Sequence, residues 1–135
     1  MNNKITRTVD INIGGKNRKM RFNINAIAEL EAKTPQRNVF KLVSDGFSIN
    51  TIVTATWIGL KYEDKNLDLK LVRNWVNAYI QKEGFIKLTA LVTGAIGLSG
   101  LINKDLKLFE DMIAEANSDE NKYQEEFDEV DDEKN

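Results

Sequence analysis

The first part of the chain alternates between apolar and polar positions with a period of two. The apolar members of this alternation, over residues 5–23, are Val9, Ile11, Ile13, Met20 and Phe22. Gly14 and Gly15 interrupt it, and paired glycines between alternating runs are typical of the tight turn of a β-hairpin. Because two strands alone are marginal in water, this hairpin needs other elements to pack on.

Beyond the hairpin, the apolar positions take the spacing of amphipathic helices. The expected segments are a helix from Asn23 or Asn25 to before Thr34, a short amphipathic turn at 39–43, and helices at 49–60, 69–83, 85–100 and 103–116. Ser48 and Asp68 are candidate N-caps, and Gly84 is a candidate left-handed stop. The β-branched content of 49–60 keeps a strand as the alternative there, although its length and spacing favour a helix.

The segment 85–100 differs from the other helices because it is apolar nearly all round. Gly94, Gly97 and Gly100 follow one another at intervals of three, which favours close helix packing over a phosphate-binding loop. A helix that is apolar on every side must be covered on every side. It is therefore either the central core helix or a surface completed by another protein.

Composition changes abruptly after Ala116. Residues 117–135 hold nine acids and two lysines, a charge of −7, whereas the preceding 116 residues carry +5. The few apolar residues of this stretch cannot offset the entropy of ordering it. We therefore expect an α+β, mainly α fold: one globular domain at 1–116, with a hairpin at 5–23 packed on a bundle of about five helices within 24–116, and a disordered acidic tail at 117–135.

The composition also argues against catalysis. The chain has neither cysteine nor histidine, which removes thiolate chemistry and the commonest general base and metal ligand. The paired acids Glu29 and Glu31, and Glu63 and Asp64, fit solvated helix ends better than acid–base chemistry. The acidic run 127–133 lacks the glycine and loop of a calcium hand. We expect no enzyme activity, no catalytic residue, no cofactor and no metal.

The charge and hydropathy of the chain indicate which classes of partner it can bind. The basic strand at 16–21 lacks a stacking platform and the domain charge is modest, so nucleic acid is an unlikely partner. No apolar run has the roughly 18 residues of a membrane span, and the start of the chain leads into no signal-type core. A basic hairpin beside an acidic tail favours self-association or a protein client, and the expected location is the cytoplasm.

Two segments resemble a known family. Residues 20–31 (MRFNINAIAELE) are similar to the opening of tail assembly chaperones and related small tail-module proteins of long-tailed bacteriophages and prophages. Residues 55–64 (ATWIGLKYED) resemble the tryptophan-glycine-leucine segment of that family, and the helix at 69–80 follows after a gap. The resemblance spans about residues 9–83 and leaves out segment 85–100 and the tail.

The resemblance implies a non-enzymatic role in virion morphogenesis. Such a chaperone coats the tape-measure protein in the cytoplasm of the bacterial host, keeps it in solution until the tail tube polymerises, and leaves the finished tail. The tail tube protein is a further candidate partner. The expected client-binding residues form an apolar groove on segment 85–100, namely Phe85, Leu88, Leu91, Val92 and Ile96. The alternative is a structural tail tube or tail-completion subunit retained in the virion.

Overall fold

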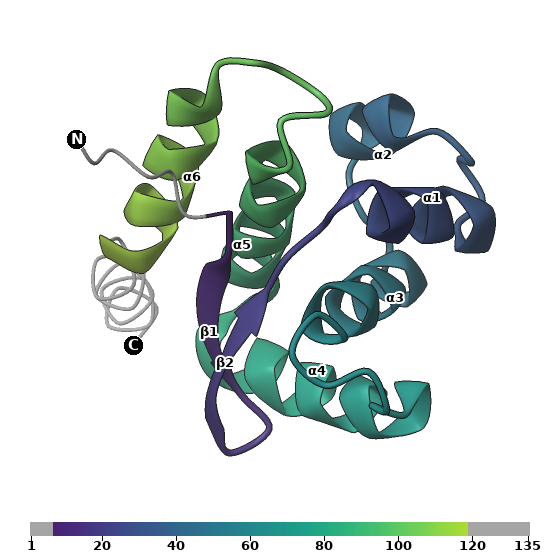
Figure 1. The fold of residues 1–135 in the computed structure, drawn as a ribbon. Helices are drawn as coiled ribbons and strands as arrows, with labels where there is room; N and C mark the ends of the chain where they lie inside the picture. Colours follow the sequence, from purple (N-terminus) through teal and green to yellow (C-terminus); the bar gives the residue numbers. More distant parts are fainter. Residues whose placement is uncertain (1–6, 119–135) are drawn as a thin grey trace, which may run out of the picture.

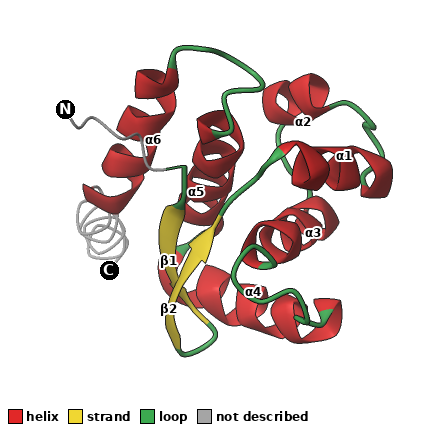
Figure 2. Ribbon diagram, in the orientation of Figure 1, coloured by secondary structure: helices red, strands yellow, loops and turns green. Residues whose placement is uncertain are grey.

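The computed structural model describes residues 7–118, which form a two-stranded antiparallel hairpin followed by six helices (Figures 1 and 2). The elements are β1 (Val9–Ile13), β2 (Lys16–Met20), α1 (Ile24–Lys33), α2 (Val39–Asp45), α3 (Ile49–Leu60), α4 (Leu69–Glu83), α5 (Phe85–Leu98) and α6 (Leu106–Ser118). This confirms the α+β, mainly α prediction. Residues 119–135 of the predicted tail lie outside the described residues.

The hairpin has the predicted register and turn. Val9 pairs with Met20 and Ile13 with Lys16, so Gly14 and Gly15 form a two-residue turn. Both glycines have positive φ, 65° and 83°, as the preferred two-residue hairpin turn requires. The alternating apolar side chains are buried against α3, α4 and α5.

Most helix starts follow the predicted capping chemistry. The side chain of Asn23 accepts a hydrogen bond from the Ala26 amide, which settles the choice between Asn23 and Asn25. Ser48 accepts from the Thr51 amide, and the segment after it is a helix rather than a strand. Asp68 is the N-cap residue of α4, as predicted, although its side chain makes no capping hydrogen bond.

The chain between α5 and α6 differs from the prediction. α5 ends at Leu98 rather than Gly100, because the Ser99 and Gly100 amides turn back to the carbonyls of Ile96 and Gly97. α6 begins at Leu106 rather than Asn103, whose side chain instead accepts from the Asp105 amide in a local turn. α6 ends at Ser118, two residues beyond its predicted end at Ala116.

α5 is the central helix of the core. It packs against α6, α3, α4 and β1, and Figure 1 shows it between α6 on one side and α3 on the other. Side chains of α6 sit on the glycines of α5, Phe109 on Gly97 and Ile113 on Gly94. The predicted close helix packing is confirmed for Gly94 and Gly97, whereas Gly100 lies beyond the end of α5, has a φ of 79° and faces the Arg7 side chain. Among the helices of residues 7–118, none is long and apolar enough to cross a bilayer.

Candidate functional site

The predicted client groove on segment 85–100 does not exist as an accessible surface in this structure. Leu88, Leu91, Val92 and Ile96 are all at most 1% exposed. They are covered because α6 closes one side of α5 while α3, α4 and β1 close the others. Phe85, at the first turn of the helix, is half-buried against the core.

The segments 20–31 and 55–64, which are separated in the sequence, fold directly against each other. The Arg21 amide donates a hydrogen bond to the Gly59 carbonyl over 3.1 Å. The ring of Phe22 lies against Gly59, where a Cβ would come within 2.9 Å of Phe22 Cε1. The glycine of the second segment is therefore needed for the first segment to pack.

A groove opens where these segments meet. Its walls come from the end of β2, the first turns of α1, and the end of α3 with the loop after it; we call it the α1–α3 groove. It encloses about 560 Å³ and is lined by Arg21, Asn23, Asn25, Ala26, Glu29, Ile58, Lys61, Tyr62 and Lys65. Every lining residue but one, Lys65, falls within 20–31 or 55–64.

The charged side chains of the α1–α3 groove give it an excess of positive charge. Lys61 Nζ lies 2.8 Å from Glu29 Oε2 and 3.8 Å from the centre of the Trp57 ring. The Arg21 guanidinium lies 5.6 Å from the Tyr62 ring centre. Within residues 7–118, neither Arg21 nor Lys65 forms an ion pair. Two cations of the groove therefore remain available to an acidic partner.

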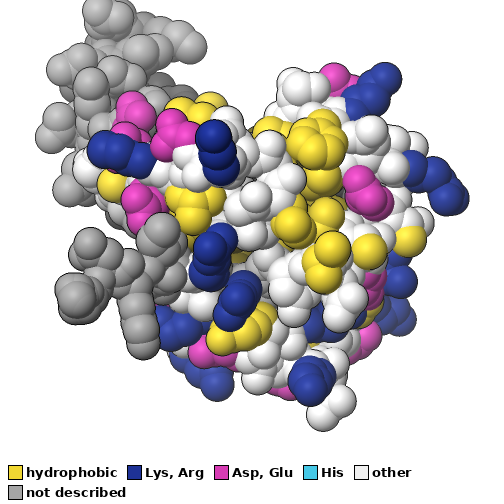
Figure 3. All heavy atoms as spheres, turned by 45° about the horizontal axis from the view of Figure 1, so that its top comes forward, with side chains coloured by type: hydrophobic (Ala, Val, Ile, Leu, Met, Phe, Trp, Pro, Cys, Tyr) yellow, Lys and Arg dark blue, Asp and Glu magenta, His cyan; other side chains and the backbone are white. Residues whose placement is uncertain are grey.

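Several large apolar side chains are exposed to solvent, and of these Tyr62 lines the groove. Ile24, in the first turn of α1, is 66% exposed, and the Tyr62 ring is also accessible to solvent. Other large exposed apolar side chains are Phe40, Ile49, Leu71, Ile86, Leu101 and Leu108. Figure 3 shows one face of the molecule, on which apolar side chains form several areas separated by uncharged and basic groups.

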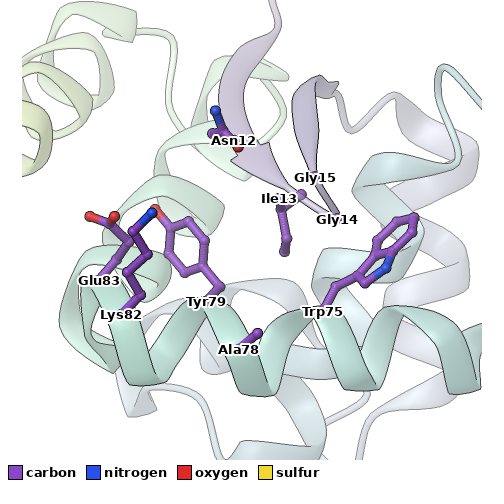
Figure 4. A pocket seen from close by; sticks show the side chains of 9 residues that line it. All are labelled: Asn12, Ile13, Gly14, Gly15, Trp75, Ala78, Tyr79, Lys82 and Glu83. Carbon is purple, nitrogen blue, oxygen red and sulfur yellow. The ribbon is translucent and has the colours of Figure 1, made fainter.

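A second pocket lies under the tip of the hairpin, with a volume of about 490 Å³. In Figure 4, Ile13 points from the hairpin toward α4, with Trp75 on one side and Tyr79 on the other. The Arg18 guanidinium lies 4.2 Å from the centre of the Trp75 ring, and its Nε donates to the Ile13 carbonyl. This packing fixes the hairpin tip on α4.

The basic residues of β2 are largely engaged within the protein. Lys19 Nζ lies 2.7 Å from Asp10 Oδ1, and this hydrogen bond and charge raise the pKa of Lys19. The Lys19 amide donates to Glu63 Oε1 over 3.0 Å, so a carboxylate closes the outer edge of β2. The positive strand is therefore a less accessible anion site than its sequence suggests.

The acid pairs considered in the sequence have separate structural partners. Glu29 pairs with Lys61, whereas Glu31 accepts from the Val39 amide over 2.8 Å. Glu63 accepts from Lys19, and Asp64 from the Asn66 amide. Within residues 7–118, no group of three or more acids is placed to hold a metal ion. The acidic run 127–133 lies outside the described residues.

Trp57 holds the loop that borders the α1–α3 groove. Its Nε1 donates to the Leu67 carbonyl over 2.8 Å. We expect Trp57→Phe to lower the free energy of unfolding by about 1–2 kcal/mol, because that carbonyl loses its donor. Trp75→Phe is the matched control, since Trp75 Nε1 donates no hydrogen bond within the described residues. Urea denaturation of both variants tests this, and equal losses would contradict it.

Comparison with known proteins finds no match to this chain among family models, curated proteins or solved structures. The α1–α3 groove and the two segments that build it are therefore the features of this protein that bear on function.

Proposed function

We propose that this protein is a non-enzymatic tail assembly chaperone of a long-tailed phage or prophage. It binds the tape-measure protein in the host cytoplasm and keeps it in solution during tail morphogenesis. The observation that carries the proposal is the convergence of the two family-like segments on one groove. Residues 20–31 and 55–64 resemble that family and together supply nearly all of the lining.

The chemistry of the groove suits an amphipathic helical client. Tyr62 offers apolar contact area, while Arg21 and Lys65 can pair with acids along the edge of an apolar stripe. Exposed apolar side chains elsewhere on the protein supply further contacts along a long client. An open groove with dispersed apolar groups favours many weak contacts over one tight pocket.

Co-expression tests the proposal. We expect the tape-measure protein of the same phage to be mostly insoluble alone and to enter the soluble fraction together with this protein. Quantitative mass spectrometry of purified virions supplies the second readout, in which a chaperone is absent from the finished tail. Stoichiometric presence of this chain in virions would contradict the proposal and support a retained tail tube or tail-completion subunit.

A further inference from the structure

Residues 7–118 and residues 119–135 carry net charges of opposite sign. Residues 7–118 hold sixteen Lys and Arg against twelve Asp and Glu, a net charge of +4. Residues 119–135 hold two lysines against nine acids, a net charge of −7. The C-terminal segment is therefore a ready electrostatic partner for a basic surface of the folded part.

The most acidic stretch of the chain complements the α1–α3 groove in its aromatic residue as well as in its charge. Residues 125–133 (EEFDEVDDE) place Phe127 between two pairs of acids. The groove places the exposed Tyr62 ring near Arg21 and Lys65, and Glu29 is the one acid in its lining. An aromatic residue flanked by acids in the sequence is therefore complementary to an exposed aromatic ring flanked by cations.

The basic hairpin is a second surface that could bind the acidic segment, but two of its cations are already engaged. Lys19 is already paired with Asp10, and Arg18 lies over Trp75 with its Nε bonded to the Ile13 carbonyl. Arg21 and Lys65, by contrast, have no acidic partner within the described residues. Pairing the acidic segment with the groove displaces fewer existing interactions.

The length of the chain permits the contact. The segment 125–129 begins seven residues after α6 ends at Ser118. At about 3.3 Å per residue, an extended chain spans roughly 23–36 Å over seven to eleven residues. A domain of this size has a radius of gyration of about 13 Å, so the segment can reach around its own body. A short tether also raises the local concentration of the segment to the millimolar range.

We infer that residues 125–133 dock into the α1–α3 groove of the same molecule and compete there with the client. The competition rests on the proposed function, whereas the docking does not and is measurable without any client. A client that binds the groove must displace the segment. Free protein is thereby protected from binding other acidic or apolar chains.

The absence of cysteine allows a direct test in the full-length protein. A nitroxide label on Val130→Cys broadens the amide NMR signals of nearby residues. We expect at least a twofold selective loss of intensity at residues 21–26 and 58–65, which recovers in 0.5 M salt because exposed charges are screened. Broadening centred on another surface, or no selective broadening, would overturn the inference.

Charge variants and mixed samples complete the test. Arg21→Ala with Lys65→Ala should abolish the selective broadening, whereas Lys70→Ala with Lys104→Ala removes two exposed lysines outside the groove and should preserve it. Mixing isotope-labelled protein without nitroxide and unlabelled protein with it detects contact between molecules. Selective broadening in that mixture would contradict docking within one molecule.

Discussion

Val92→Asp in α5 is expected to unfold the protein. Val92 is 0% exposed and is surrounded by core residues from several elements. A carboxylate there has no cation to pair with, and burying one costs several kcal/mol even after the structure relaxes. Together with the lost apolar contacts we expect a loss of about 5 kcal/mol, comparable to the whole stability of many domains.

Ile86→Asp provides the matched control for this prediction. Ile86 lies on the same helix and is 73% exposed, so the same negative charge remains in water. We expect its free energy of unfolding to stay within about 0.5 kcal/mol of the parent. Circular dichroism and urea denaturation distinguish the two variants. A folded Val92→Asp protein of parental stability would show that the α5 face is not the core.

Gly97→Ala is expected to loosen α6 from the rest of the protein. A methyl group at Gly97 would occupy the position of the Phe109 ring, so the helices must move apart. Overpacking of this kind costs about 1–3 kcal/mol, and the better helix propensity of alanine returns at most about 1 kcal/mol. Because α6 packs mainly on α5, we expect the loss of stability to be greatest in α6.

Hydrogen exchange measures where protection is lost in Gly97→Ala. We expect the amides of α6 to exchange faster while those of α3 keep their protection, since α3 does not depend on α6. Shortening the opposing side chain with Phe109→Leu in the same chain should restore part of the lost stability. If the double variant is less stable by the sum of both single losses, the Gly97–Phe109 contact is not the cause.

Local sequence patterns predicted the elements well where the determining interactions are local. The paired glycines set the hairpin turn, and Asn23 and Ser48 cap helices through side chains that reach amides three residues away. The boundaries of α6 were missed because the Asn103 side chain starts a turn that competes with a helical start. The same residue type can cap a helix or a turn, and the pattern does not decide between them.

The site could be predicted only in part. An all-round apolar pattern shows that α5 must be covered, but not whether its own chain or a partner covers it. The α1–α3 groove depends on the contact of Arg21 with Gly59, and no local periodicity encodes a contact between such distant residues. The resemblance covers both segments that line the groove, but it assigned no site residue to them, and the site was predicted on segment 85–100 instead.

The affinity of groove variants for the tape-measure protein shows directly whether the client binds in the α1–α3 groove. Arg21→Glu with Lys65→Glu reverses two charges in the groove, and Lys70→Glu with Lys104→Glu makes the same change outside it. We expect the groove variant to bind about tenfold to a hundredfold more weakly, because two cations become repulsive, with the control near parental affinity. Equal affinities of the two folded variants would show that the client does not bind in the α1–α3 groove.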